Sequence, residues 1–419
     1  MRLSVAANFD PRLPEALGGY PVHELFGKLP RDFVGGGRAS YMLSPVSRRS
    51  LANHVAQAHR RGIQFNYLLN AACLNNLEWT GRGQREIERL LAWLARIGVD
   101  SITVSLPHLL ELIKRRYPQF RVKVGVFAGV DGVQKAKWWE DLGADGITLA
   151  SLVVNRNFPL LAAIRRSVAC DLQLLVNTNC LQACPLASAH MVALSHASQA
   201  GPAAGGFLID YCFLKCTQMR LREPVNYIRS DWIRPEDLHH YQALSYDRFK
   251  IAERDIPTPL MAARVKAYAG RRYEGNLLDL VQPYGFRDVK DSGRYYRHGL
   301  GWLLRFFFRP MLANPARILP LKRLADLLSM TRPAQGDPLV HIDNRALDGF
   351  MERFRERGCR EEDCGECRWC HGFAAKSVRM DEGKRARALA ACEDVFRALH
   401  GGSMWRYLPG RKVRRGGST

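Results

Sequence analysis

The sequence lacks a long run of apolar residues. The longest candidate, Trp302 to Phe308, is seven residues long and is interrupted by Arg305, whereas a membrane-spanning helix needs about 20 predominantly apolar residues. The first residues, Met1 to Val5, lead directly into a strand-like segment and do not resemble a secretory leader. We therefore expect a soluble protein of the cytoplasm, a reducing compartment, with no transmembrane segment.

Several catalytic motifs are also missing from the sequence. No Gly-x-Gly-x-x-Gly follows the first predicted strand, which disfavours a dinucleotide-binding open sheet. Neither Gly-x-Ser-x-Gly nor His-Glu-x-x-His occurs, so the usual serine-hydrolase and zinc-peptidase sites are not indicated. Cys180 and Cys184 have no third cysteine two residues further on, as the C-x3-C-x2-C motif of radical-SAM enzymes requires.

Acidic residues are few compared with basic ones. The chain has 40 Asp and Glu against 62 Lys and Arg, which gives a formal net charge of +22 and a pI of about 9.8. Such a balance favours RNA or another anionic partner, but it also arises from the arginine-rich composition of a GC-rich genome. The basic residues are spread along the chain and no RNA-binding motif is visible, so both interpretations stay open.

The first 270 residues alternate between short apolar runs and amphipathic segments. Eight such βα units predict a (β/α)8 barrel of the TIM type, followed by a mainly helical, cysteine-rich C-terminal extension. The predicted strands are Leu3–Ala7, Asp32–Gly35, Ile63–Leu69, Ser101–Ser105, Val122–Phe127, Gly146–Ala150, Leu172–Val176 and Arg248–Ala252.

The length of 419 residues fits one barrel with additions at its C-terminal side. We divide the chain into a barrel over 1–274, a linker and helical extension over 275–340, a cysteine-rich domain over 341–404, and a basic tail over 405–419 that we expect to be disordered. Within the third part, residues 343–358 predict an amphipathic helix with Leu347, Phe350 and Phe354 on one face.

Eight of the 11 cysteines fall into two groups. In the first group, Cys180 and Cys184 form one C-x3-C pair and Cys212 and Cys216 form another, in the long segment after the seventh predicted strand. Four thiolates are the donor set of a [4Fe–4S] cluster or of a structural zinc ion. The alternative is four separately buried cysteines. We predict one shared cluster at the barrel mouth.

The second group has four cysteines within 12 residues: Cys359, Cys364, Cys367 and Cys370. Their C-x4-C-x2-C-x2-C spacing is close to that of bacterial ferredoxins, and a four-thiolate zinc site is the alternative. The loop offers no obvious open coordination position. We therefore predict a second metal centre, an iron–sulfur cluster or zinc, with a structural or electron-transferring role.

Chemistry in a parallel barrel takes place at the carboxyl ends of the strands. At these ends we find Asn177 and Asn179 after the seventh predicted strand and Glu253 after the eighth. Glu253 is the strongest candidate for a general acid or base, although an ion pair with Arg254 or Arg272 would explain it equally well. We predict Glu253, Asn177 and Asn179 as catalytic residues.

These features resemble the collagenase-like peptidase family U32. The resemblance rests on the barrel rhythm, on the first cysteine group, and on the segment from Trp232-Ile-Arg-Pro235 to Glu253-Arg254. Ile342 to Phe350, with the cysteines that follow, resembles an extension found in some members. Several characterised relatives are oxygen-independent hydroxylases that hold a [4Fe–4S] cluster on four cysteines. They act on RNA bases or ubiquinone precursors, with prephenate as the proposed oxygen donor for some.

The resemblance implies an iron–sulfur enzyme that hydroxylates, or otherwise modifies by a redox step, a small ring substrate or an RNA base. It further implies an electron donor and a partner subunit of the same family. The alternative implied by the family name is a peptidase that acts on unfolded chains. A second alternative, motivated by the net charge of +22, is an RNA-associated binding protein.

Overall fold

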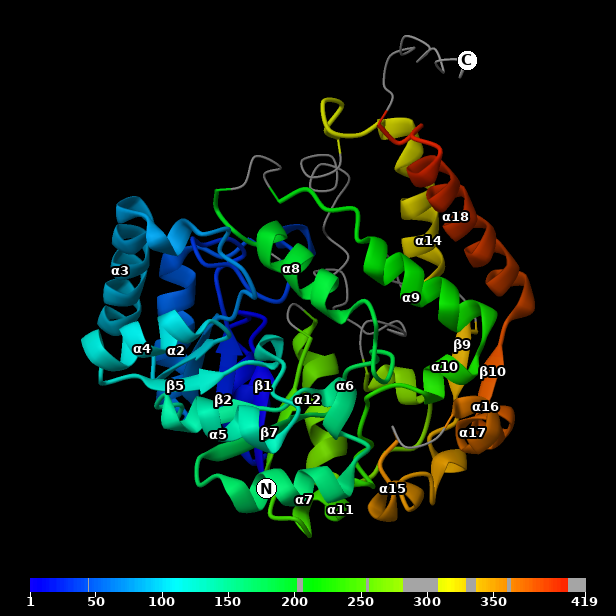
Figure 1. Ribbon diagram of the computed structural model, residues 1–419, viewed down its shortest axis with the longest axis horizontal. Helices are drawn as coiled ribbons and strands as arrows, with labels where there is room; N and C mark the ends of the chain where they lie inside the picture. Colours follow the sequence, from blue (N-terminus) through cyan, green and yellow to red (C-terminus); the bar gives the residue numbers. More distant parts are fainter. Residues whose placement is uncertain are drawn as a thin grey trace, which may run out of the picture.

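Eight parallel strands form a closed barrel in the computed structural model (Figure 1). They pair in chain order, and β8 closes the barrel against β1, with Val5 opposite Ile251. The predicted TIM-type barrel is therefore confirmed. The strands are β1 (Arg2–Ala6), β2 (Val22–Gly27), β3 (Gln64–Leu69), β4 (Ser101–Val104), β5 (Arg121–Val124), β6 (Gly146–Thr148), β7 (Asp171–Leu175) and β8 (Arg248–Ile251).

The structure describes residues 1–43, 45–201, 206–253, 256–281, 308–328, 337–359 and 363–405. The predicted disorder of the basic tail falls outside these residues from 406 onward. Most of the predicted linker over 275–340 also lies outside them, as does the apolar run up to residue 307.

Helices surround the barrel and continue beyond it. Figure 1 shows α2, α3 and α4 on one side of the barrel and α9, α14 and α18 together on the other. The barrel helices are α1 (Leu13–Ala16), α2 (Arg48–Arg60), α3 (Gly81–Arg96), α4 (Pro107–Arg116), α5 (Val133–Asp141), α6 (Ser151–Val154), α7 (Phe158–Ser167), α8 (Ala187–Ala197), α9 (Tyr211–Arg222), α10 (Val225–Ile228), α11 (Leu238–Gln242) and α12 (Thr258–Gly270).

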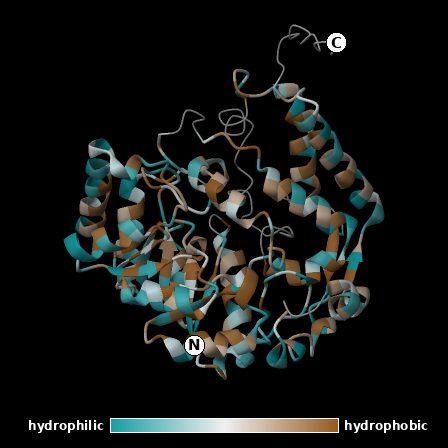
Figure 2. Ribbon diagram, viewed as in Figure 1, coloured by the Kyte–Doolittle hydropathy of each residue, from teal (hydrophilic) through white to brown (hydrophobic). Residues whose placement is uncertain are grey.

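The helices form for local reasons that the sequence already contains. At the start of α3, the Thr80 hydroxyl accepts a hydrogen bond from the Gly83 amide at 2.9 Å and so caps the helix. Ile87, Leu91 and Leu94 recur at helical spacing and are buried against the barrel. Figure 2 shows the same arrangement generally, with apolar residues concentrated on the strands and on the helix sides that face them.

The predicted second strand was wrong. Asp32–Gly35 is a loop that makes a single bridge from Asp32 to Gln199, and the strand is instead β2 (Val22–Gly27). His23 and Glu24 interrupt the apolar pattern of β2, which hides it from a hydrophobicity argument. The structure explains the interruption, because Glu24 is fully buried and forms an ion pair with Lys123, 99 residues away.

The barrel interior is polar. Glu24 accepts hydrogen bonds from the hydroxyl of Ser4 at 3.1 Å and the amide of Asn66 at 3.2 Å. Burial alone would raise the pKa of Glu24, but the ammonium group of Lys123 outweighs burial and lowers that pKa to about 2. Every strand of the barrel contributes to this group of polar side chains: Ser4, Glu24, Asn66, Ser101, Thr103, Lys123, Thr148, Gln173 and Lys250.

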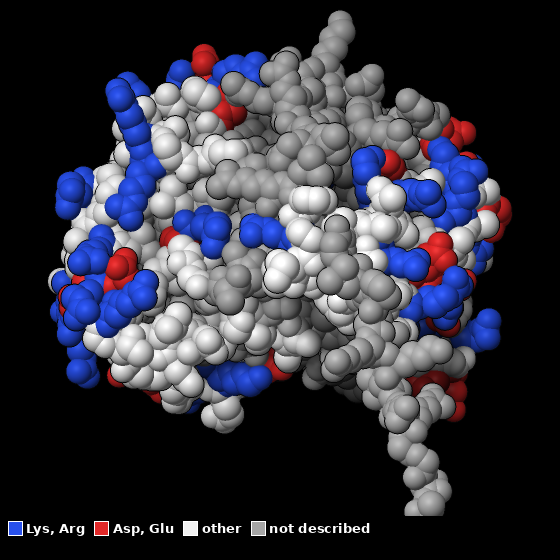
Figure 3. Space-filling model, turned by 90° about the horizontal axis from the view of Figure 1, so that it is seen from above, with Lys and Arg blue, Asp and Glu red and all other residues white. Residues whose placement is uncertain are grey.

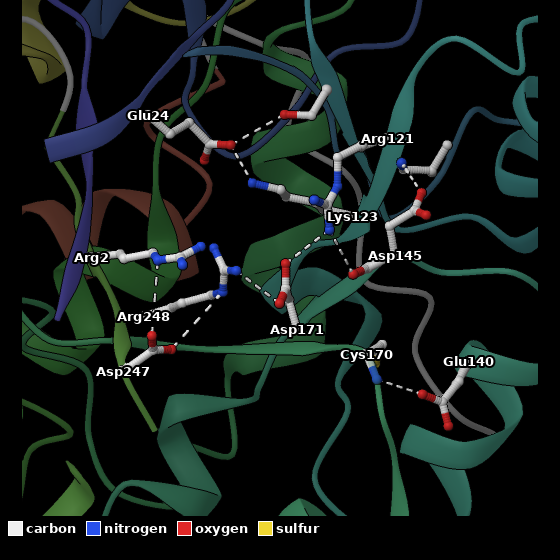
Figure 4. A network of polar contacts seen from close by, with 12 residues as sticks. Arg2, Glu24, Arg121, Lys123, Glu140, Asp145, Cys170, Asp171, Asp247 and Arg248 are labelled. Carbon is white, nitrogen blue, oxygen red and sulfur yellow. Dashed lines mark hydrogen bonds and ion pairs between the residues drawn. The ribbon is translucent and has the colours of Figure 1, made fainter. Parts of the chain in front are cut away.

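Ion pairs also join the strands where they begin, as Figure 4 shows. Asp171, the first residue of β7, accepts from Arg121 of β5 at 2.9 Å and pairs with Arg248 of β8 at 2.9 Å. Asp145, just before β6, accepts from the amide of Val122 at 2.6 Å. Carboxylates and guanidinium groups are therefore matched across this end of the barrel.

The C-terminal extension is mainly helical and shares the core of the barrel. Its antiparallel strands pair Arg379 with His341, and its buried residues Phe350 and Val395 belong to the same hydrophobic cluster as the barrel residue Leu3. Its elements are α14 (Leu319–Leu327), β9 (Val340–Ile342), α15 (Arg353–Glu356), α16 (Cys364–Cys367), α17 (Trp369–Ser377), β10 (Val378–Met380) and α18 (Glu382–His400).

The predicted continuous helix over residues 343–358 was wrong. The segment holds only a 3-10 turn at Arg345–Leu347 and the short α15. Gly349 lies between them with a φ of +80°, a left-handed conformation that ends a helix. The apolar face is nevertheless present, because Leu347, Phe350 and Phe354 are all buried.

Candidate functional site

The first cysteine group lies after β7, in a loop and on α9. Cys180 and Cys184 belong to the loop between β7 and α8, and Cys212 and Cys216 lie in α9. The Asp210 carboxylate accepts from the Phe213 amide at 2.9 Å and caps α9. Four residues apart, Cys212 and Cys216 are neighbours on one side of that helix.

The C-terminal end of α8, which is labelled in Figure 1, is bonded to the loops that follow β2 and β3. The amide of Gly36, in the loop after β2, donates to the Ser198 hydroxyl at 2.7 Å. The amide of Ala72, just after β3, donates to the Ser195 hydroxyl at 2.8 Å. The long segment after β7 therefore covers part of the mouth, and its cysteines lie at the end of the barrel where this fold places its chemistry.

The four thiols of the first group lie close enough to influence one another electrostatically. Burial raises the pKa of Cys180 well above its usual value, and Cys216 and Cys184 add to the effect. Burial raises the pKa of Cys212 to about 11, again with contributions from Cys184 and Cys216. Within the described part of the chain, however, no three His, Cys, Asp or Glu side chains are placed so that they could hold a metal ion.

Arg220 adds a positive charge beside these thiols. Its guanidinium group donates to the sulfur of Cys216 at 3.1 Å and to the carbonyl oxygen of Asn179. The side chain is almost completely buried, at 1% exposure. The first cysteine group therefore has a buried cation in direct contact with one of its sulfur atoms.

Asp231 fixes the loop that carries Cys180. Its carboxylate accepts from the Cys180 amide at 2.8 Å, from Thr178 at 2.7 Å and from Ser151 at 2.6 Å. Burial raises the pKa of Asp231, although these three hydrogen bonds act in the opposite direction. Sequence reasoning missed both Asp231 and Arg220, and the only local signal was an acid directly before the apolar Trp232-Ile233.

The two predicted asparagines have different surroundings. Asn177 donates to the carbonyl oxygens of Ala252 at 2.9 Å and Leu280 at 3.3 Å, and accepts from the Ala252 amide at 2.6 Å. It therefore joins the ends of β7 and β8. Asn179 is buried, yet among the described residues neither its side-chain nitrogen nor its oxygen has a hydrogen-bond partner.

Glu253 lies directly after β8 in a strained backbone conformation, with a φ of +89°. Its carboxylate pairs with Arg38 at 2.6 Å. This partner comes from the loop after β2 and was not among those expected from the sequence. Arg272 instead pairs with Glu274, and Arg254 lies outside the described residues. Glu253 and Arg38 thus bring opposite charges together at the mouth.

Three successive glycines, residues 35–37, let the loop after β2 approach the mouth closely. A Cβ atom at Gly36 would lie 2.5 Å from Oδ1 of Asn70, and one at Gly35 would lie 2.7 Å from the carbonyl oxygen of Ser195. Asn70 follows β3, and its buried Oδ1 has no partner in the described structure. Sequence reasoning overlooked this loop, for which the run of glycines was the available signal.

The second cysteine group lies beside the barrel wall. Cys370 is buried at the start of α17, Cys359 and Cys367 are half-buried, and Cys364 is exposed. A negative charge on Cys364 would raise the pKa of both Cys359 and Cys370, in addition to the effect of burial. As in the first group, the described positions do not bring three of these thiols to metal-binding distance.

Basic side chains do not form one continuous patch on the face that Figure 3 shows. Lys and Arg occur there in separate groups, several with an acidic side chain beside them. Among the described residues, no helix has both the length and the apolar character needed to cross a membrane.

Comparisons with known proteins identify relatives of the chain. The family model for peptidase family U32 matches residues 37–181, a span that runs from the glycine loop to the first cysteines. The solved structure of the U32 peptidase Mk0906 covers 61% of this chain and 94% of its own, at 22% identity and a TM-score of 0.47. Phosphoribosyl anthranilate isomerase from Thermus thermophilus covers 65% and 98%, at 13% identity and a TM-score of 0.33.

A curated relative matches over most of both chains. It is the uncharacterized protease MJ1657 of Methanocaldococcus jannaschii, which is 31% identical over 349 residues, or 83% of this chain and 87% of the relative. The aligned length is too great to reflect a shared barrel alone. On this match and the family model, the chain belongs to peptidase family U32.

Proposed function

We propose that the chain is an iron–sulfur enzyme in which Cys180, Cys184, Cys212 and Cys216 hold a [4Fe–4S] cluster at the barrel mouth. The observation that carries this proposal is that Arg220 of α9 contacts both the sulfur of Cys216 and the carbonyl oxygen of Asn179, the residue before Cys180, so that the two C-x3-C segments lie side by side. Four thiolates are the complete ligand set of such a cluster. Cluster binding would require these thiols to move closer together than in the described positions.

The surroundings of the cysteines support this assignment. The Arg220 guanidinium group contacts the Cys216 sulfur, and hydrogen bonds and positive charge around thiolate sulfurs stabilise an anionic cluster. Asp231 holds the Cys180 amide and so fixes the loop at its first ligand. These two contacts orient Cys216 and Cys180, two of the proposed cluster ligands.

We propose a hydroxylation or related redox step on a small ring or an RNA base. Hydroxylation replaces a ring C–H bond by C–OH and withdraws two electrons from the ring, so a donor molecule must deliver the oxygen and accept two electrons. An organic hydroxyl donor, R–OH converted to R–H, meets this balance. The cluster, when bound, supplies an iron that activates the donor or carries electrons.

The residues of the chain itself have separate tasks in this proposal. Asn179 offers a buried amide with both polar atoms available to bind a ring substituent. Glu253 takes up the proton that leaves the ring carbon at a carboxylate oxygen, once substrate weakens its contact with Arg38. Asn177 holds the strand ends in register through its backbone contacts and does not itself meet the substrate.

Anaerobic purification and reconstitution with iron and sulfide test the proposal. We expect a brown protein with roughly four irons at the barrel site, and a Cys180→Ser, Cys216→Ser double variant that loses them. Cys170→Ser is the matched control, because Cys170 lies before β7 at the opposite end of the barrel, where its amide contacts Glu140. A wild-type protein that stays colourless and binds only zinc would disprove the cluster.

A peptidase is the second candidate. It is favoured by the name of the curated relative and by a His190–Asp210 pair at 2.9 Å, in which Asp210 precedes Cys212 by two residues. Burial raises the pKa of Cys212 to about 11, however, whereas a cysteine nucleophile needs a lowered pKa. Cleavage of denatured casein that survives iron chelation and disappears in His190→Ala would establish this function over the first.

A further inference from the structure

Arg156 is a buried cation for which the described residues supply no matching anion. It follows α6, is 0% exposed, and its guanidinium group lies over the rings of Trp232 and Phe350 at 4.7 Å each and of Phe354 at 5.6 Å. Its Nη1 donates to the carbonyl oxygen of Ile228 at 2.6 Å. Among the described residues, Nε and Nη2 have no hydrogen-bond partner and no carboxylate forms an ion pair with this side chain.

A buried, unneutralised guanidinium group is strongly unfavourable, because aromatic faces and a single carbonyl replace only part of its lost hydration. Native proteins retain such a group where an anion compensates for it. The structure therefore calls for a negative charge close to Arg156 that the described carboxylates do not supply.

The second cysteine group lies next to this cation. The Cys359 amide donates to the carbonyl oxygen of Arg156 at 3.2 Å. A Cβ atom at Gly358 would lie only 2.7 Å from Nδ2 of Asn157, so the two segments are in close contact. The start of the cysteine group therefore lies in contact with the segment that carries the buried arginine.

Arg229 approaches the same cysteines from the end of α10. Its Nη2 lies 3.4 Å from the carbonyl oxygen of Cys364 and 3.4 Å from ring nitrogens of His371. Its Nε is buried without a partner in the described structure. A second guanidinium group thus lies against the cysteine segment, at the carbonyl oxygen of Cys364.

We propose that Cys359, Cys364, Cys367 and Cys370 bind one metal centre as four thiolates, and that Arg156 and Arg229 of the barrel wall are its counter-cations. Four thiolates around Zn²⁺, or around the [4Fe–4S]²⁺ core, carry a net charge of about −2. Two guanidinium groups balance that charge. In the described positions these thiols are not yet at metal-binding distance, so the proposal requires them to approach one another when the metal binds.

This centre attaches the extension to the barrel. Cys359 directly follows Gly358, which is in contact with Asn157, and both counter-cations belong to the barrel part of the chain. The centre is independent of the four cysteines at the mouth, because no residue is shared between the two groups. Loss of one site therefore leaves the other intact, and the two proposals can fail separately.

Metal content per chain is the first test, measured by elemental analysis after reconstitution with zinc alone and, separately, with iron and sulfide. The Cys364→Ser, Cys367→Ser double variant is expected to lose one site, either about one zinc or about four irons. Cys180→Ser, Cys216→Ser retains that site. Zinc uptake identifies a structural centre, and iron uptake with sulfide identifies an electron carrier. Unchanged metal content in the Cys364/Cys367 variant would overturn the proposal.

The rate of metal release to a chromophoric chelator tests the counter-cations. Arg229→Gln, a half-buried position, is expected to release the metal of this site about ten-fold faster, as changes beside metal ligands usually do. Arg222→Gln is the matched control, since Arg222 is an exposed arginine paired with Glu393. Arg156→Lys keeps the charge and should retain the metal, whereas Arg156→Met should release it faster. Equal release rates in Arg229→Gln and Arg222→Gln would overturn the role of the cations.

Discussion

The two ends of the barrel differ in how their polar groups are matched. Where the strands begin, Asp171 joins Arg121 and Arg248, and the buried Glu24 joins Lys123 (Figure 4). Where the strands end, Asn179 and Asn70 keep buried polar atoms without partners in the described structure. Matched groups stabilise a fold, whereas a buried polar atom without a partner calls for an explanation, of which contact with a ligand is one. We therefore assign a stabilising role to the end where the strands begin. We expect the chemistry at the end where the strands end, as in other barrels of this type.

Positive φ angles near the strands are more frequent where the strands end, although Ser245, just before β8, also has one. Among the described residues other than glycine, several with positive φ lie in loops after strands: Phe9, Asn75, Asn76, Ala183 and Glu253. Ala183 and Glu253 adopt positive φ although neither is Asn or Asp, which reach this conformation more readily than other residues with a side chain. Such conformations persist where the surrounding structure holds a site in place.

The largest effect on stability is expected at the end where the strands begin. Glu24→Gln leaves Lys123 in the barrel interior without its carboxylate and should lower the free energy of unfolding by about 3 kcal/mol, the cost of breaking a buried pair. Urea denaturation measures this. The control Glu86→Gln breaks the exposed pair with Arg89 and should cost at most about 0.5 kcal/mol. Equal losses of unfolding free energy in the two variants would show that the Glu24–Lys123 pair stabilises the barrel no more than an exposed pair does.

His54 tests whether a buried polar side chain without a hydrogen-bond partner in the described structure is always part of a functional site. His54 is 1% exposed, packs against Phe9 and Phe65, and has no partner for either ring nitrogen among the described residues. Burial lowers its pKa to about 4, with Asp10 acting in the opposite direction. Below pH 6.5 the unfolded chain binds a proton that the folded chain excludes, so stability falls as the pH falls toward 4.

The expected loss from this one residue between pH 7 and pH 5 is about 2 kcal/mol. His54→Leu should remove that part of the pH dependence, measured by urea denaturation at both pH values, while metal content stays at the wild-type level. If His54→Leu instead reduced bound iron, a side chain of α2 would also support the metal site. The contrast between the two ends of the barrel would then not explain where function lies.

The two asparagines after β7 provide a matched pair. Asn177→Ala leaves backbone groups of Ala252 and Leu280 without partners and should cost about 2 kcal/mol of stability. Asn179→Ala removes a side chain that has no hydrogen-bond partner among the described residues, so a change within about 0.5 kcal/mol is expected. Thermal unfolding of both variants decides this. A larger loss in Asn179→Ala would show that its role is structural.

The sequence predicted most of the barrel because buried parallel strands are short apolar runs with turns between them. β2 escaped this reasoning, since Glu24 is compensated only by a lysine 99 residues away. The helix over 343–358 was wrong because the positive φ of Gly349 interrupts it. In each case a single tertiary contact or backbone angle overrode a local pattern.

The candidate site was predictable where spacing carries the information. Cysteine pairs are visible in the sequence, and so are asparagines after a strand. The charges around them are not, because Asp231, Arg220 and Arg156 reach their partners through the fold: Asp231 holds Cys180 from 51 residues away and Arg220 holds Asn179 from 41. The ion pair of Glu253 with Arg38 spans 215 residues. No local pattern predicts such contacts.

The most direct test of this account is the iron and sulfide content of the anaerobically reconstituted protein, compared between the wild type and the Cys180→Ser, Cys216→Ser variant. If the mouth of the barrel is the chemical end, the wild type should hold roughly four irons at this site, and the variant should lose them while its urea denaturation midpoint stays close to that of the apoprotein. Equal iron content in the two proteins would contradict the central claim.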